Sequence, residues 1–306
     1  MVKQRIGSAL SVFALAGIVG GAVLVAPASA AHVDEWGSAA PLTGINDPTA
    51  ADGCPIESPD GASVFIASTR GPGGDNDIWT ASLSADGQVV GAPEMLPAPV
   101  NTDAQEFCPT PLRGNWLLFV STRGGVDAYG TAACGAGDMY LTRRSPATGE
   151  WSEPRNLGCA PHGPNGPGTE YGPSVVETAA GVQLYFSTGG AVGSGTQDIQ
   201  MSQRRADGSF GAPHPVAELN TGVDDAMPNL RKDGLEVVFT SNRGGGAGLF
   251  DIWTATRASV FDPWSAPVNV AAVNTAASET RPSLSWDGRR LYLGRSGDIQ
   301  VSHRER

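Results

Sequence analysis

Basic residues are scarce in this sequence. Lys3 and Lys232 are the only lysines among 306 residues, and 20 Lys and Arg stand against 31 Asp and Glu, a formal net charge of −11. A surface this negative repels phosphate backbones and anionic lipid head groups. We therefore expect no nucleic-acid partner and no binding to membrane surfaces.

Long hydrophobic runs are also rare, and the one that exists covers residues 6–25. Basic residues precede it and Ala-Ser-Ala follows it at 28–30, which is the pattern of a cleaved export signal. We predict a signal peptide over residues 1–30 and a single secreted domain, extracellular or periplasmic, over residues 31–306. No later run is long enough to cross a bilayer, so no membrane insertion is expected.

Cysteine and histidine number only four each. In an exported chain, four cysteines predict two disulfides. No pair of histidines has the spacing of metal ligands. The sequence after the signal also has no helical period of useful length, no glycine-rich phosphate loop before a helix and no Gly-x-Ser-x-Gly nucleophile elbow. These absences argue against a helical fold, a nucleotide site and a serine hydrolase.

Glycine and proline are abundant instead, with 41 and 23 residues, and they recur between short apolar strands. In each repeat an acidic residue stands three positions before a proline, at Asp52/Pro55, Glu106/Pro109, Glu170/Pro173, Asp225/Pro228 and Glu279/Pro282. The prolines lie 54, 64, 55 and 54 residues apart. A unit of about fifty residues with four short strands is the size of a propeller blade.

The last repeat stops after its third strand, near His303. Residues 36–46 resemble residues 264–274, which follow the third strand of the preceding repeat. We therefore predict that the N-terminal segment supplies the fourth strand of the last blade and closes the ring, because closure removes an open sheet edge. The predicted fold is an all-β, five-bladed β-propeller of four-stranded blades, and an open solenoid is the rival.

The order of the motifs resembles a known family. Each unit runs through E-x-x-P, D-G, a V-x-F-x-S-x-R strand, G-G and D-I-W, and a V-N-T spacer precedes the acid, as at 100–102. This pattern resembles the WD-like repeat of TolB-type propellers over essentially all of the chain after the signal. The resemblance implies the propeller fold. It leaves function open, because family members include partner-binding scaffolds, secreted proteins and polysaccharide-active enzymes.

Five carboxylates, one per blade, precede the innermost strands and are expected to surround the mouth of the central channel: Asp52, Glu106, Glu170, Asp225 and Glu279. Three interpretations compete. In the first, each acid caps a turn or pairs with an arginine such as Arg70, Arg123 or Arg243. In the second, the carboxylates hold a cation, and Ca²⁺ suits hard oxygen ligands. In the third, two carboxyls flank a sugar bond, one with a raised pKa as the acid and one ionised.

Departures from the repeat make the loop face uneven. Blade two has two long loops, 124–137 and 158–169, blade three has Gly189 where other strands have arginine, and blade five has almost no loop. An asymmetric face suits a specific ligand. The acids nearest the long loops are the catalytic candidates: Glu106, Glu170 and Asp225. The ligand-binding candidates are Asp52, Glu279, Arg70, Arg123, Arg243, His162 and Tyr171.

The positions of the cysteines predict their pairing. Cys54 and Cys108 each stand one residue before the proline in neighbouring blades, and Cys134 and Cys159 lie in the two long loops of blade two. We expect the disulfides Cys54–Cys108 and Cys134–Cys159, the second because insertions that long usually need a staple.

Two functions follow from these observations. The first is a secreted binding protein, expected to be a monomer, with a saccharide, a cell-wall fragment or a protein partner held on the uneven loop face. The alternative is a glycan-active enzyme, a hydrolase or a lyase, that uses paired carboxylates at the channel mouth. Ca²⁺ is the one cofactor that the sequence supports, through the second interpretation of the acids.

Overall fold

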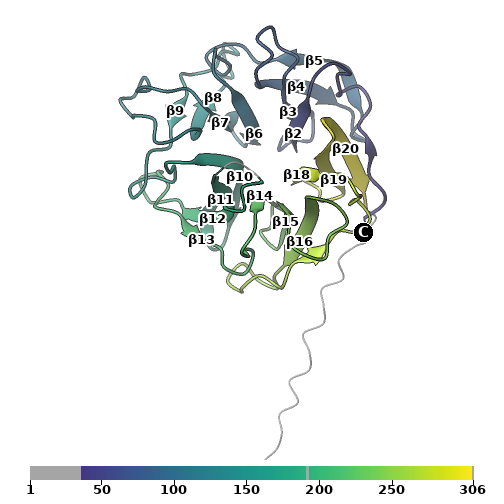
Figure 1. Ribbon diagram of the computed structural model, residues 1–306. Helices are drawn as coiled ribbons and strands as arrows, with labels where there is room; N and C mark the ends of the chain where they lie inside the picture. The colour runs from purple at the N-terminus through teal and green to yellow at the C-terminus, as the bar shows by residue number, and fades with distance from the viewer. Residues whose placement is uncertain (1–35, 191–192, 305–306) are drawn as a thin grey trace, which may run out of the picture. The chain divides into compact units, whose positions relative to one another are not determined.

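The computed structural model describes residues 36–190 and 193–304, and the predicted signal peptide falls outside them. The regular structure of the described residues forms five four-stranded antiparallel sheets, set around a channel like the blades of a propeller (Figure 1). The five-bladed propeller that the repeat predicts is therefore confirmed. Among the described residues, no helix is long and apolar enough to span a membrane.

Each blade is built from strands that follow one another outward from the channel. Blade one consists of β2 (Asp52–Glu57), β3 (Ser63–Ser68), β4 (Asp77–Leu83) and β5 (Val89–Met95). Blade two consists of β6 (Glu106–Leu112), β7 (Trp116–Ser121), β8 (Asp138–Arg143) and β9 (Arg155–Asn156). Blade three consists of β10 (Thr169–Thr178), β11 (Gly181–Gly189), β12 (Asp198–Gln203) and β13 (His214–Pro215).

Blades four and five continue the ring. Blade four consists of β14 (Asp225–Leu230), β15 (Glu236–Ser241), β16 (Asp251–Thr256) and β17 (Val268–Asn269). Blade five consists of β18 (Glu279–Leu284), β19 (Arg290–Arg295), β20 (Asp298–His303) and β1 (Ala40–Pro41). In every blade, the acid of the repeat is the first or second residue of the innermost strand.

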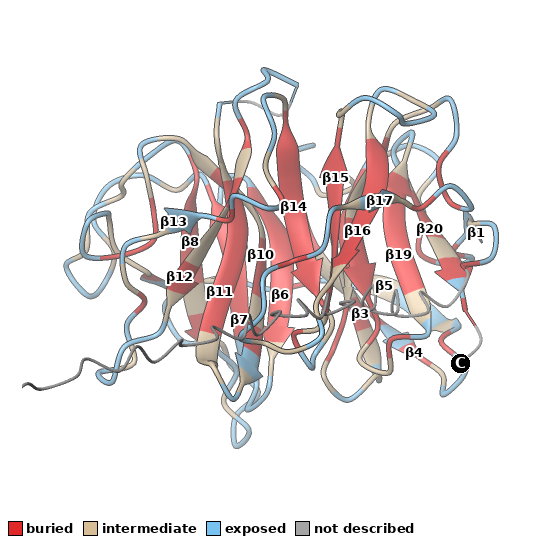
Figure 2. Ribbon diagram, turned by 90° about the horizontal axis from the view of Figure 1, so that it is seen from below, coloured by how far each residue is buried: buried red, intermediate tan, exposed pale blue. Residues whose placement is uncertain are grey.

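Blade five takes its outer strand from the N-terminal segment, as predicted (Figure 2). We call residues 36–46 the strap. Its strand β1 pairs antiparallel with β20, and two backbone hydrogen bonds extend the pairing: from Gly37 N–H to the His303 carbonyl and from Leu42 N–H to the Ile299 carbonyl, each at 2.9 Å. The strap thus covers the edge of β20 and closes the ring.

The hydrophobic core lies between the blades. Five clusters of buried apolar side chains each span at least two neighbouring blades. In the seam between blades five and one, for example, Tyr292 of β19 packs in the same cluster as Val64 of β3. The strap contributes Trp36 to one seam and Ile45 to another. In Figure 2 the strands are mostly coloured as buried, whereas the loops that connect them are mostly exposed or intermediate.

An asparagine in each connecting loop clamps the third strand of a blade. Asn101 Oδ1 accepts the Ile78 N–H at 2.8 Å, and its amide donates to the carbonyls of Ile78 at 3.0 Å and Leu96 at 2.8 Å. In every blade, the residue that follows the Asp at the start of the third strand has its N–H and its carbonyl bonded to one asparagine side chain. In the other four blades this asparagine is Asn46, Asn165, Asn220 or Asn274. The asparagine of the V-N-T spacer is therefore structural, a role that the sequence did not reveal.

Substitution of one clamp is expected to destabilise the protein clearly. Asn101→Ala leaves the buried N–H of Ile78 and the carbonyl of Leu96 without these partners, whereas the Ile78 carbonyl keeps the Leu96 N–H. We expect the substitution to lower the free energy of unfolding by about 2 to 4 kcal/mol. Chemical denaturation measures this loss. Asn76→Ala is the control, since Asn76 makes one exposed side-chain bond to Gln105 and its loss is expected to cost under about 0.5 kcal/mol. Equal stability of the two variants would show that the clamp has no energetic role.

Candidate functional site at the channel mouth

The five carboxylates lie on the innermost strands, which contact one another around the channel. Their residues are buried, with 4% relative exposure for Asp52 and 0% for Glu106, Glu170, Asp225 and Glu279. Each acid also donates its backbone N–H to a carbonyl of the preceding blade in the ring, as Glu106 does to Asn76 at 2.7 Å. The ring of acids therefore joins neighbouring blades and is not open to solvent.

Arginine neutralises four of the five carboxylates. The ion pairs are Asp52–Arg70, Glu106–Arg123, Asp225–Arg243 and Glu279–Arg295. Hydroxyl and backbone groups add further bonds: Glu106 accepts the Thr102 N–H and hydroxyl, each at 2.9 Å, and the Ser121 hydroxyl at 2.6 Å. These four acids thus have the geometry of the first interpretation, in which arginine balances each carboxylate.

Three of the four arginines in these pairs also lie over aromatic rings. The guanidinium carbon of Arg70 lies 5.4 Å from the ring centroid of Trp79, and that of Arg123 lies 5.2 Å from the ring of Tyr140. Arg243 lies over Trp253 in the same way, at 5.3 Å. Because these guanidinium groups bind a carboxylate, backbone carbonyls and an aromatic face, little of their hydrogen-bonding capacity is left for a ligand.

Glu170 is the exception in the ring. Thr188 lies opposite Glu170 in the strand register, and this moves the arginine position to Gly190, one residue beyond the Gly189 that the sequence comparison indicated. The spacer threonine is also replaced, by Gly166, so Glu170 accepts only the Gly166 N–H at 2.9 Å and the Thr188 hydroxyl at 3.0 Å, both on Oε1. Its buried Oε2 has no hydrogen-bond partner among the described residues. Burial raises the pKa of Glu170 to about 8.

Both disulfides have the predicted pairing. Cys54–Cys108 joins the inner strands of blades one and two beside the channel, and Cys134–Cys159 ties together the two long loops of blade two. Disulfides are typical of proteins that function outside the reducing cytosol.

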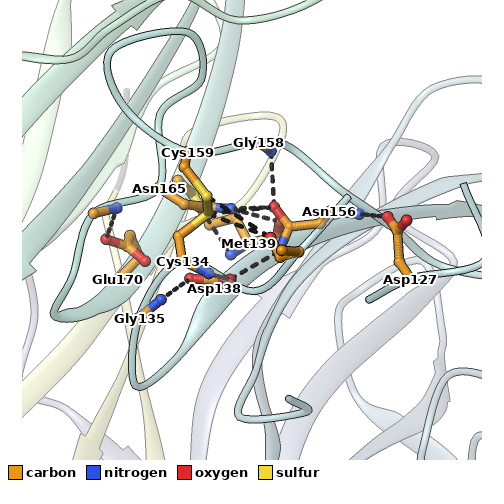
Figure 3. The surroundings of a disulfide bond; sticks show 12 residues. Asp127, Cys134, Gly135, Asp138, Met139, Asn156, Gly158, Cys159, Asn165 and Glu170 are labelled. Carbon is orange, nitrogen blue, oxygen red and sulfur yellow. Dashed lines mark hydrogen bonds between the residues drawn. A yellow bond between two sulfur atoms is a disulfide. The ribbon is translucent and has the colours of Figure 1, made fainter. Parts of the chain in front are cut away.

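Polar groups surround the second disulfide (Figure 3). Asp138 accepts the backbone N–H of Cys134 at 2.6 Å and of Gly135 at 3.1 Å, and the side-chain amide of Asn156 at 2.8 Å. Asn156 Oδ1 in turn accepts the side-chain amide of Asn165 at 2.9 Å. The long loops of blade two are thus fixed by a covalent link and by a hydrogen-bond network.

An exposed aromatic ring lies on the first of these loops. Tyr129 is 56% exposed, its hydroxyl donates to the Glu153 carbonyl at 3.2 Å, and the Arg155 guanidinium lies 5.9 Å from its ring centroid. The loop is therefore folded against the outer strand β9. The sequence revealed the length of this loop and gave Tyr129 no role, because a single tyrosine in a glycine-rich loop forms no pattern.

The remaining two sequence candidates are His162 and Tyr171, and neither side chain is hydrogen-bonded to an acid of the ring. His162 is exposed in the second long loop, where its carbonyl accepts a bond from Arg205 at 2.7 Å. Tyr171 packs against Phe107 of the neighbouring blade, with 5.7 Å between ring centroids. The structure therefore does not bring the ten candidate residues together around one open cavity. It pairs four of the acids with arginines, and neither His162 nor Tyr171 takes part in these pairs.

Residues 36–190 and 193–304 contain no set of ligands for the Ca²⁺ ion of the second interpretation. No group of three or more His, Cys, Asp or Glu side chains in these ranges is placed to hold a metal ion. Four mouth carboxylates already bind arginine, and the fifth, Glu170, is buried with a pKa of about 8.

Comparisons with known proteins give matches at the level of structure. Neither models of protein families nor curated protein sequences match the chain. A putative TolB from Agrobacterium tumefaciens aligns with a TM-score of 0.45 and 18% identity, over 79% of this chain and 69% of that one. An endo-arabinase from Bacteroides thetaiotaomicron VPI-5482 aligns with a TM-score of 0.54 and 13% identity, over 89% and 98%.

An alpha-L-arabinofuranosidase from Lactobacillus brevis aligns similarly, with a TM-score of 0.52 and 12% identity over 87% of this chain and 94% of that one. At such identities, the two likenesses to glycan-active enzymes show a shared fold and nothing of shared chemistry.

Proposed function

We propose that the chain is an exported binding protein and that its ligand is a saccharide or a cell-wall fragment held on the loops of blade two. The observation that carries the proposal is the Tyr129 ring, which is 56% exposed on a loop fixed by the Cys134–Cys159 disulfide. Rigid tyrosine rings offer a large amphipathic contact surface at low entropic cost. The two disulfides support export.

The loop that carries the Tyr129 ring is preorganised by hydrogen bonds. Asp127 accepts the backbone N–H of Tyr129 at 2.9 Å and of Thr131 at 2.7 Å, and its second oxygen accepts the Asn156 N–H at 2.8 Å. Arg155 lies near the ring and, being charged and exposed, is available to bind hydroxyl groups. Fixing these groups in advance lowers the entropy lost on binding.

The burial of the acids favours binding over catalysis. A glycosidase needs two carboxyl groups that flank the scissile bond, about 5 to 9.5 Å apart and in contact with substrate. The five mouth acids are 0–4% exposed, and four of them bind arginine. A glycan-active enzyme that uses Glu106, Glu170 or Asp225 stays the alternative, and the same experiment separates the two.

The test measures binding of purified protein to soluble plant, fungal and bacterial glycans by calorimetry. For a glycan that binds, we expect Tyr129→Ala to lower the affinity at least about tenfold, as loss of a central aromatic contact does. Tyr129→Phe should bind like the unmodified protein, because the ring is kept.

Trp116→Ala is the matched control. Trp116 is also exposed, at 38%, and lies under a guanidinium, that of Arg143 at 5.4 Å, but it begins β7 at the end of the blade opposite the acids. The Trp116→Ala variant should bind the glycan with unchanged affinity. Release of new reducing ends by the unmodified protein, lost in Glu106→Gln, would establish the enzyme instead. Retention of glycan binding by Tyr129→Ala would place the ligand away from blade two.

A further inference from the structure

A second ring of residues surrounds the channel, two positions after the acids. Each lies at the β-bulge of an innermost strand and has a positive φ between 47° and 56°: Cys54, Cys108, Gly172, Met227 and Arg281. With the prolines that follow, these residues line a cavity of about 30 Å³ in the channel. A cavity of this size has room for one or two water-sized occupants.

Arg281 is the charged member of this second ring, and its side chain reaches across to blade one. A Cβ on Gly53 would stand 2.3 Å from Arg281 Nη1, so the neighbouring blade accommodates the guanidinium only because this residue is glycine. Within the described residues, the guanidinium has no hydrogen bond and no ion pair, and only the backbone N–H of Arg281 is bonded, to the Thr240 hydroxyl at 3.0 Å. No carboxylate lines this cavity.

The absence of a counter-charge separates Arg281 from the arginines at the mouth, each of which binds a carboxylate. Burial lowers the pKa of Arg281, and the nearby Tyr171 hydroxyl acts in the opposite direction. Because arginine stays protonated in proteins, the partly buried guanidinium of Arg281 carries a positive charge that no carboxylate of the described residues balances.

We propose that the channel is an anion-binding site with Arg281 as its charged anchor, and that it takes one small monovalent anion of the halide class. The size of the cavity limits the occupant to a few atoms. The guanidinium supplies several N–H donors at a place without competing carboxylates. Since the protein is strongly negative overall, with a net charge of −11, anions do not gather on it without a local site of this kind.

The first test measures melting temperature in sodium bromide, sodium chloride and sodium gluconate at constant ionic strength. The variant is Arg281→Met, which has a precedent in the fold, since Met227 occupies the equivalent position of blade four at φ 54°. We expect bromide and chloride to raise the melting temperature of the unmodified protein saturably, and to have no specific effect on Arg281→Met. Arg144→Met is the control: Arg144 is exposed and its side chain bonds only the Gly149 carbonyl.

The second test needs no variant. Crystals of the unmodified protein soaked in bromide should show an anomalous peak in the channel, in contact with the Arg281 guanidinium. The proposal is overturned if this peak is absent and the halide response is the same in all three proteins. Occupancy by formate without a bromide peak would also overturn the halide site, and would assign the position to the carboxylate of a larger ligand.

Discussion

Removal of the strap is expected to bring the protein close to unfolding. Trp36, Leu42 and Ile45 are 6%, 3% and 0% exposed, and burying a large apolar side chain contributes about 1.5 to 3 kcal/mol. Asn46 adds the clamp on Ile299. Deleting residues 36–46 should therefore lower the free energy of unfolding by about 5 to 9 kcal/mol, against a total of about 5 to 15 kcal/mol for an ordinary domain.

Thermal and chemical denaturation of the truncated protein measure this loss. A synthetic peptide of residues 36–46, added in excess, should restore part of the stability by pairing with the free edge of β20. A peptide of the same composition in scrambled order is the control. If the truncated protein melts at the same temperature as the intact one, the strap does not hold the ring closed.

Glu170 is expected to make stability fall as pH rises. Its folded pKa of about 8 lies above the ordinary 4.5, so the folded state favours the protonated carboxyl. The protonated Glu170 contributes to the free energy of unfolding. This contribution is fully present below about pH 4.5 and is lost progressively as the pH rises to about 8. The expected loss is on the order of 4 kcal/mol. Glu170→Gln imitates the protonated group, so it should match the unmodified protein near pH 4.5 and exceed its stability above pH 8.

Two further variants sharpen this test, and urea denaturation at a series of pH values is the measurement for all of them. Gly190→Arg places a guanidinium at the position that Arg70 has in blade one. The heavy atoms nearest to the added Cβ are the Ser194 and Thr196 hydroxyl oxygens, both at 2.8 Å, so these two side chains have to shift slightly. It should flatten the pH profile by stabilising ionised Glu170. Glu106→Gln should instead destabilise by about 2 to 4 kcal/mol at neutral pH, because Arg123 loses its carboxylate. Parallel pH profiles for the unmodified protein and Glu170→Gln would contradict the assignment.

The architecture could be predicted from the sequence because the repeated residues have repeated structural roles. Proline spacing predicted the size of a blade, since every inner strand needs the same bulge before the same proline. The similarity between Trp36 and Trp264 predicted ring closure, because both segments pack against a third strand. The equivalent positions of Cys54 and Cys108 predicted a disulfide between neighbouring blades.

The candidate site could be predicted only in part, because burial and strand register decide which groups meet. Arg295 lies directly opposite Glu279 in the register, whereas Arg70 lies two residues beyond the residue opposite Asp52, yet each arginine reaches the acid of its own blade. Nothing in the linear sequence distinguishes these two positions of the arginine relative to the acid. For the same reason, the sequence does not show that the arginine position of blade three is held by Gly190 and not by Gly189.

Arg281 escaped the sequence analysis for a different reason. Comparison of repeats reveals what the blades share, and this position holds Cys, Cys, Gly, Met and Arg in turn. Its importance comes from a left-handed backbone conformation that directs the side chain into the channel. One signal was present: of the ten residues between an acid and its proline, two in each blade, Arg281 alone is charged.

The pairing of the strap with β20 also determines which blade is completed last during synthesis and folding. Its contacts join residues that are far apart in the chain, at sequence separations of 253 for Asn46 and Ile299 and 265 for Gly37 and Ser302. A growing chain makes the strap first and its partner strand last, so the apolar side chains of Trp36, Leu42 and Ile45 stay uncovered until almost the whole polypeptide exists. Because so distant a contact is slow to form, blade five is completed last. Until then, the nascent protein carries both a bare strand edge and a loose strand that matches it, and a second unfinished copy can supply either one.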